Sequence, residues 1–373
     1  MRTSAGLLIT TVVLCGVSHT LAFTSPFLWN ARRCLASPQR SVDMKNPNGF
    51  ALRSRPNCPV ACQNSDTNEG KKEDGGTGDV FVLSFDGVLC DSVRETSRIA
   101  FEVACEQWPE EMGKSDKIKP REAGVRKSWV EYDWQEYEQD TDGGMPRWLQ
   151  EKLRQLRPVT RSPADMVLAA RLCVSEALAA KRSLRGQRPL SVGEIVENWE
   201  EMRDLLAYKY GAAPAELEAK FESRLAQGAS AEAEGGDFYD GMVCALRGSR
   251  ASLVVMSPRP TELTAQVMEA AGLELDQDRL SLLQVPEGGA ADAVAHVIAD
   301  MPQRGVQVVT DRLEELRAMA SDLRLAQHGR VSLRFAAWGY STPGQRAAVA
   351  GWPRVRAMEP QELQALLLSG TPE

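Results

Sequence analysis

The stretch VFVLSFDG, residues 80–87, decides how the rest of this sequence is interpreted. Its β-branched and aromatic start predicts a short buried strand, and the polar residues Ser84 and Asp86 come at the end of that strand. Side chains two residues apart on a strand point to the same side. The stretch therefore presents a hydroxyl and a carboxylate together at the tip of a strand, which is a favourable place for a functional site.

The charge of the 373-residue chain is uneven. The overall net charge is −7, but residues 1–77 carry nine basic and five acidic residues, a net +4, which leaves −11 for residues 78–373. The hydrophobic content of 43% is ordinary for a globular protein. Because an acidic body repels phosphate backbones and anionic lipid, we expect no nucleic acid partner and no membrane partner for the processed protein.

The N-terminus has the pattern of a targeting sequence. Residues 1–22 combine Arg2, a short apolar run and a small residue, Ala22, which is typical of a signal peptide. Residues 23–77 form the second part. Within it, residues 23–56 contain six basic residues and one acidic residue, which is the composition of a transit peptide. Residues 57–77 are a polar, Gly-rich linker that we expect to be disordered. The two parts resemble the presequences of proteins imported into plastids acquired from another eukaryotic alga. We expect a plastid (chloroplast) protein, with secretion as the alternative.

The second half of the chain alternates between strand and helix patterns. Strands are expected at 80–85, 252–257, 280–285, 306–311 and 331–339, and helices at 261–273, 290–301 and 313–325. Short apolar strands separated by helices of this length predict β-α-β units. The fold class is therefore α/β, with a Rossmann-like parallel sheet of at least five strands.

Residues 93–235 show helix patterns and no convincing strand, as in the capping box of Ser191 and Glu194. The predicted domains are a core of residues 78–92 plus 236–373 and an inserted all-helical cap of residues 93–235. The insertion follows the first strand directly, so the cap is expected over the carboxyl end of that strand, where open parallel sheets bind ligands.

Five stretches in this order resemble the haloacid dehalogenase-like (HAD) superfamily, and more closely its cyanobacterial and plastid branch of HAD-like hydrolases. The stretches are FDGVLCDS (85–92), RPVTRSPADM (157–166), LSVGEIVENWE (190–200), TDRLEELRAM (310–319) and WGYST (338–342). The resemblance covers residues 80–370 and implies a HAD core with a cap domain.

The resemblance also implies roles for the residues at the strand ends. In this family an aspartate attacks phosphorus and binds Mg²⁺, and a second aspartate two residues later protonates the leaving oxygen. Here Asp86 matches the second, and Ser84 stands at the position of the nucleophile. Ser257 matches the serine or threonine that binds the phosphoryl group. For Ser84 we favour a neutral remnant at the strand end. For Ser257 and Asp311, a purely structural role at the strand end is the alternative to phosphate or metal contact.

The remaining positions of the family pattern are also altered. The lysine that offsets phosphate charge is absent near 286–294, where Glu287 and Asp292 occur instead. Thr310 replaces one member of the acidic pair that holds the metal, and Asp311 remains as a weak metal ligand. Because Mg²⁺ sites of this kind depend on two or three carboxylates, we expect Mg²⁺ binding to be weak or absent.

These changes predict a plastid protein of HAD-like fold that is catalytically degenerate, and that binds a phosphorylated small molecule or a protein partner. The alternative is an active Mg²⁺-dependent phosphatase-like hydrolase with an altered site. Dehalogenation would need the same missing aspartate. A reaction through Ser84 would need a base beside it, and Asp86 is a poor base for an alcohol. The acidic and aromatic run 129–140 is expected to be a solvated part of the cap.

Overall fold

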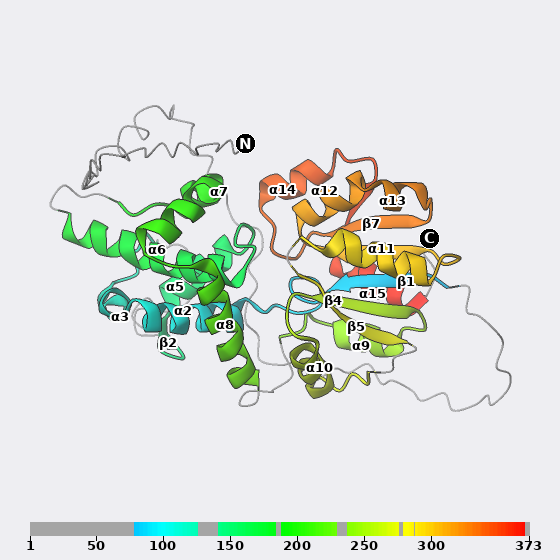
Figure 1. The fold of residues 1–373 in the computed structure, drawn as a ribbon, viewed down its shortest axis with the longest axis horizontal. Coiled ribbons are helices and arrows are strands. Elements are labelled where there is room, and N and C mark those ends of the chain that lie inside the picture. Colours follow the sequence, from blue (N-terminus) through cyan, green and yellow to red (C-terminus); the bar gives the residue numbers. More distant parts are fainter. Residues whose placement is uncertain are drawn as a thin grey trace, which may run out of the picture. The chain divides into compact units, whose positions relative to one another are not determined.

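A parallel sheet of six strands forms the centre of the part of the chain that the structure describes (Figure 1). The computed structural model describes residues 78–125, 141–183, 188–229, 237–275, 279–286 and 288–369. The strand order is β5-β4-β1-β6-β7-β8, and all neighbours pair in parallel. The strands are β1 (Val80–Ser84), β4 (Ser252–Ser257), β5 (Leu280–Gln284), β6 (Val306–Thr310), β7 (Val331–Ala336) and β8 (Val355–Met358).

Helices cover both faces of this sheet, as the alternating pattern predicts. One face packs on α9 (Met242–Gly248), α10 (Thr261–Ala270) and α15 (Pro360–Ser369) through a buried apolar cluster. The other face packs on a second cluster formed with α11 (Ala290–Asp300), α12 (Leu313–Ser321), α13 (Leu323–Gln327) and α14 (Pro343–Val349). The predicted Rossmann-like fold class is confirmed.

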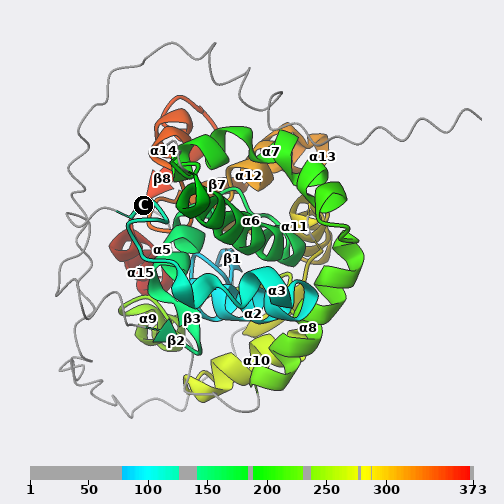
Figure 2. The ribbon, with the colours of Figure 1, turned by 90° about the vertical axis from the view of Figure 1, so that its left-hand side faces the viewer.

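The segment between β1 and α9 is mainly helical (Figure 2). Its helices are α2 (Val93–Gln107), α3 (Pro109–Met112), α5 (Arg147–Leu156), α6 (Pro163–Arg182), α7 (Val192–Lys209) and α8 (Pro214–Ala229), with a 3₁₀ turn at Ser115–Lys117. The predicted capping box at the start of α7 is present, since the Ser191 hydroxyl accepts from the Glu194 backbone and the Glu194 carboxylate accepts from the Ser191 backbone. We call residues 93–235 the cap and the sheet with its helices the core.

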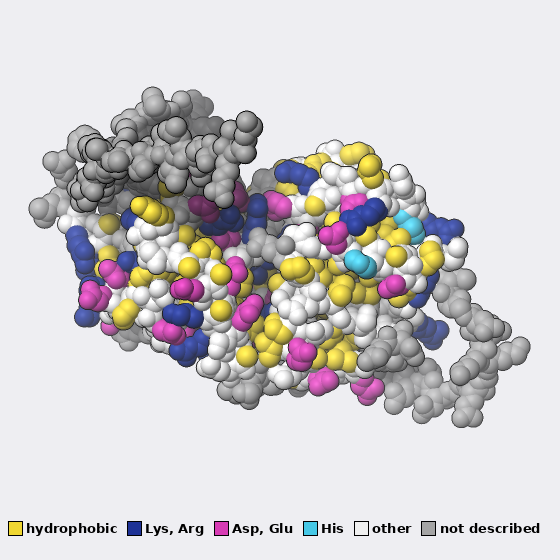
Figure 3. Space-filling model, in the orientation of Figure 1, with side chains coloured by type: hydrophobic (Ala, Val, Ile, Leu, Met, Phe, Trp, Pro, Cys, Tyr) yellow, Lys and Arg dark blue, Asp and Glu magenta, His cyan; other side chains and the backbone are white. Residues whose placement is uncertain are grey.

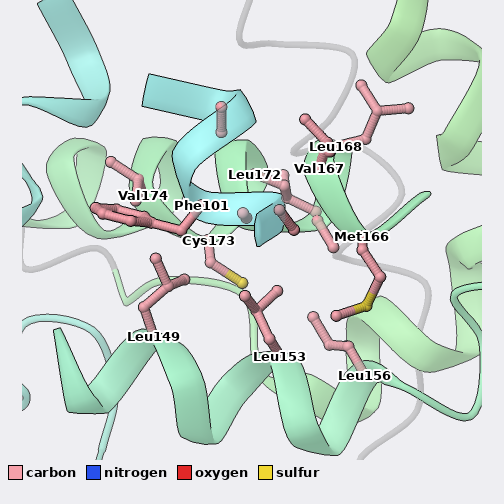
Figure 4. Close-up of a cluster of buried hydrophobic side chains, with 14 of the residues drawn as sticks. Phe101, Leu149, Leu153, Leu156, Met166, Val167, Leu168, Leu172, Cys173 and Val174 are labelled. Atoms are coloured by element: carbon pink, nitrogen blue, oxygen red, sulfur yellow. The ribbon is translucent and has the colours of Figure 1, made fainter. Parts of the chain in front are cut away.

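The cap has a hydrophobic cluster of its own, formed by residues of 99–225. Figure 4 shows Leu149, Leu153 and Leu156 of α5 opposite the apolar face of α6, with Phe101 of α2 between them. The spacing of four and three residues along α5 places these leucines on one helical face, as the sequence indicates. The helices of the cap therefore bury apolar surface against one another.

Two details of the sequence prediction need correction, and the sheet has one strand beyond the five that were located. The cap is not entirely helical, because β2 (Thr141–Asp142) pairs antiparallel with β3 (Met145–Pro146). Gly143 and Gly144 between them have φ of 57° and 82°, which the tight turn of a hairpin needs and which glycine adopts without strain. The sheet also has the additional strand β8, which pairs with β7. Finally, the single helix expected at 313–325 is divided at Asp322, whose side chain caps α13.

The described residues include no helix long and apolar enough to span a membrane. On the face drawn in Figure 3, basic and acidic side chains lie among one another without a large patch of one sign. The targeting pattern in residues 1–77 and the run 129–140 lie outside the described residues, so their predictions stay predictions.

Candidate functional site

The candidate site lies at the carboxyl ends of β1, β4 and β6, where the polar residues predicted from the sequence meet. β1 is the central strand of the three, and it pairs with β4 up to Ser84 and Met256. Ser84, Asp86 and Ser257 line one small cavity, of about 40 Å³, together with Glu315. Asp311 lines an adjacent cavity of about 140 Å³ that also contains Glu315. The parallel topology thus gathers residues that are more than 200 positions apart in the sequence.

Asp86 is part of a buried charge cluster that the sequence analysis missed. Arg259 Nη2 lies 3.1 Å from Asp86 Oδ1, and Arg259 Nη1 donates a hydrogen bond of 2.7 Å to Glu95 Oε2. The Arg259–Asp86 contact is an ion pair without a well-aligned hydrogen bond, because neither atom has a hydrogen-bond partner among the described residues. Burial disfavours the charged carboxylate, but Arg259, with help from the Ser92 hydroxyl, still lowers the pKa of Asp86 below its ordinary value of 3.8. Asp86 is therefore held as a carboxylate.

The two serines of the site differ in their partners. Ser257 Oγ accepts a hydrogen bond of 3.1 Å from the backbone N–H of Arg259, so Ser257 does stabilise the turn after β4. Its own O–H remains available as a donor towards the cavity. The Ser84 side chain makes no hydrogen bond to any described residue and is only partly buried. Within the described part of the chain, no base is therefore in position to activate the Ser84 hydroxyl.

Asp311 lies in a cage of backbone atoms. Its Oδ2 accepts a hydrogen bond of 2.7 Å from the backbone N–H of Tyr340. Gly87 and Gly339 pack directly on its carboxyl group, and a Cβ atom at Gly87 would lie 2.2 Å from Oδ2. Burial raises the pKa of Asp311 to about 6, although Arg312 and the Tyr340 hydrogen bond favour the charged form. The carboxyl group is therefore positioned firmly, but it is easier to protonate than an ordinary aspartate.

The residues do not fit a magnesium ion. Thr310 is fully buried, and its hydroxyl donates a hydrogen bond of 2.9 Å to Glu315 Oε2 instead of facing a ligand. Glu315 also lies 3.8 Å from Arg312 Nε. The described residues include no group of three His, Cys, Asp or Glu side chains able to hold a metal ion. Mg²⁺ needs several oxygen ligands in near-octahedral geometry, and here the nearby carboxylates already have guanidinium groups as counter-charges.

The cap contributes two arginines to the same site. Arg157 and Arg161, in the segment between α5 and α6, line the larger cavity together with Arg312 of the core. Arg312 Nη1 donates a hydrogen bond of 3.3 Å to the Arg161 carbonyl, so the cap and the core are in contact here. The guanidinium carbon of Arg157 lies 5.1 Å from the ring centroid of Tyr340. The larger cavity is therefore lined by three arginines, two from the cap and one from the core.

Of the two acidic residues near the predicted position of the family lysine, Asp292 has no part in this arrangement. Asp292 pairs with Arg324 at a distance of 2.6 Å, and both side chains are exposed. Glu287 lies outside the described residues. The charge at the site comes instead from residues elsewhere in the chain.

No protein-family model and no curated protein matches the chain. Solved structures do match it. A haloacid dehalogenase-like family hydrolase from Streptococcus pneumoniae is 12% identical, covers 78% of this chain and 98% of its own, and has a TM-score of 0.35. A predicted phosphoglycolate phosphatase from Haemophilus somnus has 12% identity, the same coverages and a TM-score of 0.37. A haloacid dehalogenase-like protein from Agrobacterium tumefaciens has 15% identity, coverages of 78% and 98%, and a TM-score of 0.33.

Several of the solved structures that match the chain are thus described as haloacid dehalogenase-like proteins. The parallel sheet and the helical insertion directly after β1 are the arrangement that the sequence analysis predicts. At TM-scores under 0.5, no residue role is transferred from the matched structures. The resemblance to the cyanobacterial and plastid branch stays a prediction.

The structure brings the predicted residues Ser84, Asp86, Ser257 and Asp311 to two neighbouring cavities, but the arginines of these cavities were not predicted. Arg259 follows Ser257 by two residues, and Arg312 directly follows Asp311, so both were adjacent to recognised motif residues. Arg157 and Arg161 lie in a stretch that supported the resemblance without a role of their own. An arginine beside a strand-end motif is the signal that could have identified them.

Proposed function

We propose that this HAD-like protein does not catalyse phosphoryl transfer and that it uses the strand-end site to hold a phosphorylated ligand in the plastid. The ion pair between Asp86 and Arg259 is the observation that carries the proposal. A general acid must be protonated before it can protonate a leaving group. A carboxylate with a lowered pKa, buried against a guanidinium, is ionised at neutral pH and is not available for that step.

The nucleophile position supports the same proposal. A serine hydroxyl needs an adjacent base, and no described residue accepts a hydrogen bond from Ser84. The site therefore lacks a competent nucleophile and a competent acid at once. Ser257, with its O–H free to donate, remains suited to contact a phosphate oxygen without any reaction.

The proposal is tested by measuring phosphate release from a panel of phosphate monoesters with Mg²⁺ present. The full-length wild type is compared with Ser84→Asp, with Ser84→Asp combined with Arg259→Gln, and with Ser84→Asn as a matched uncharged control. We expect the wild type, Ser84→Asp and Ser84→Asn to stay near background. The double variant should gain the most, because it restores a nucleophile and also frees Asp86 to be protonated.

The competing function is an active phosphatase-like hydrolase with an altered site. Robust turnover by the wild type that Ser84→Ala abolishes would support it, because the serine would then carry the reaction. Turnover that survives Ser84→Ala but is lost in Asp86→Asn would indicate attack by water with help from Asp86. Either result would overturn the proposal of a non-catalytic site.

A further inference from the structure

Arg157 is a buried cation with unused hydrogen-bonding capacity. Its residue exposure is 8%, and among the described residues its guanidinium makes a single hydrogen bond, from Nη1 to the Thr160 carbonyl at 2.8 Å. Its Nε is buried without an acceptor. A guanidinium has five N–H donors, and a buried donor without a partner is costly. Arg157 makes no ion pair within the described part of the chain, although Asp86 and Asp311 favour its charged form from a greater distance.

A second guanidinium lies close enough to Arg157 to repel it. Burial and the neighbouring Arg312 both lower the pKa of Arg157, although the group remains a cation at neutral pH. Arg157, Arg161 and Arg312 line the same cavity of about 140 Å³, which is large enough for several water molecules or one small anion. An anion in this cavity would relieve the repulsion and supply the missing acceptors.

Three acidic residues, Asp311, Glu314 and Glu315, line the cavity and oppose an anion, and two of them are already engaged. Asp311 accepts the Tyr340 backbone hydrogen bond, and burial raises its pKa to about 6. Glu315 accepts from the Thr310 hydroxyl and lies 3.8 Å from Arg312 Nε. The Arg161 charge is shared with the exposed Glu200 at 2.7 Å. Arg157 makes no ion pair with a described residue and has a buried donor without an acceptor.

We propose that Arg157, Arg161 and Arg312 hold the phosphate group of a phosphorylated small molecule directly, without a metal ion. This proposal rests on the proposed function, since it names the groups that take the ligand's charge. Guanidinium groups match phosphate oxygens with paired N–H donors and remain charged at all physiological pH values. They can therefore replace the combined charge of a lysine and a magnesium ion, neither of which this site provides.

A bound phosphate would also contact two parts of the chain, because the three arginines come from both the cap and the core. Arg157 and Arg161 belong to the cap, and Arg312 belongs to the core. A phosphate bound to all three would join the two parts of the chain. The smaller cavity at Ser84 and Ser257 shares Arg161 and Arg312 with the larger one, so the rest of the ligand lies within reach of the strand-end serines.

The experiment is a calorimetric titration of the full-length protein with inorganic phosphate at pH ~8, in the presence of a metal chelator. We expect binding with a Kd of roughly millimolar order, unchanged when Mg²⁺ replaces the chelator. Arg157→Gln should weaken binding about tenfold or more, since it removes charge-assisted hydrogen bonds. Arg356→Gln removes an exposed arginine paired with Glu362 outside both cavities, and it should leave the affinity unchanged.

Arg312→Gln and Arg161→Gln serve as second variants in case Arg157→Gln does not fold, and a thermal transition is recorded for each. Absence of phosphate binding by the wild type would overturn the proposal, as would binding that appears only with Mg²⁺. Equal affinity of the wild type and of every folded arginine variant would overturn it too. Phosphate release in the monoester assay would instead contradict the proposed absence of catalysis, so the two proposals fail on different measurements.

Discussion

The guanidinium of Arg259 lies 3.1 Å from the carboxylate of Asp86, and both side chains are more than nine-tenths buried. The resemblance predicts a proton donor at Asp86, and this pair involves that residue. Glu95 binds another nitrogen of the same guanidinium, so the cluster contains two carboxylates and one guanidinium. Its burial makes it sensitive to the loss of any member.

Removal of one partner of this cluster should destabilise the protein strongly. We expect Arg259→Met to lower the free energy of unfolding by about 3–5 kcal/mol, because it leaves the Asp86 and Glu95 charges without compensation. The double variant Arg259→Met with Asp86→Asn should lose less than the sum of the two single variants. Urea denaturation of the four proteins measures this coupling.

The matched control for that cycle is Arg356→Gln, whose ion pair with Glu362 is exposed and should contribute about 0–1 kcal/mol. Additive effects of the single and double variants on the free energy of unfolding would show that Asp86 and Arg259 do not interact.

The pKa of Asp86 is lowered in the folded state. Its contribution to stability is therefore complete above the unfolded value of 3.8 and is lost as the pH falls below about 4.

Asp311 should make the protein less stable as the pH rises from about 4 to about 6. Its pKa is raised to about 6, so in this window the folded state binds more protons than the unfolded state, and the free energy of unfolding decreases with pH. The total effect is of the order of 3 kcal/mol. Denaturation curves of Asp311→Asn at pH 4 and pH 7 should show a smaller decrease than those of the wild type.

Asp300→Asn is the control for Asp311, because it removes an exposed aspartate by the same change of atoms. It should leave the difference between pH 4 and pH 7 as in the wild type. A raised pKa at Asp311 would be contradicted if the free energy of unfolding of the wild type increased from pH 4 to pH 7 and Asp311→Asn showed the same increase.

The backbone around Asp311 should tolerate no added methyl group. A Cβ atom at Gly339 would lie 2.5 Å from the Gly87 carbonyl oxygen and 2.4 Å from Asp311 Cβ. Since these contacts involve backbone and the first side-chain carbon, Gly339→Ala forces the cage to shift, at a cost of about 1–3 kcal/mol. Thermal denaturation should show a clearly lowered midpoint.

Gly344→Ala provides the opposite result in the same region. Gly344 lies in α14, and the nearest atom to an added Cβ is 3.8 Å away. Alanine is a better helix former than glycine, so this variant should be stabilised by up to about 1 kcal/mol. Equal midpoints for the two alanine variants would mean that the packing around Asp311 is not as close as described.

The targeting prediction is tested independently of the fold. A fluorescent protein fused after residues 1–60 should appear in the plastid of an alga with a secondary plastid, because both the signal part and the basic transit part are included. Deletion of residues 1–22 should leave the fusion in the cytosol. Secretion of the complete fusion would contradict the plastid assignment.

Local patterns predicted much of the framework. The helix Arg147–Leu156 follows a local pattern, because its leucines recur at helical spacing and Pro146 precedes it. The strand Ser252–Ser257 was also predicted with its observed bounds. Val355–Met358 was missed, since a four-residue strand at the edge of a sheet carries too little pattern to be distinguished from a loop. The Gly143-Gly144 hairpin was missed for the same reason.

The α/β class and the helical insertion after the first strand could be predicted from the sequence alone, because both depend on the periodicity of apolar residues. The replacement of a family aspartate by Ser84 stays a prediction from the resemblance. Only the tertiary structure decided how the charges pair. Arg259 follows β4 and pairs with Asp86, which follows the neighbouring strand β1. Arg157 belongs to the cap and lines the same cavity as Asp311 of the core. In both cases the two residues are far apart in the sequence. The pKa of a carboxylate depends on burial and on the charges around it in space, so the state of Asp86 followed from the fold and not from its motif.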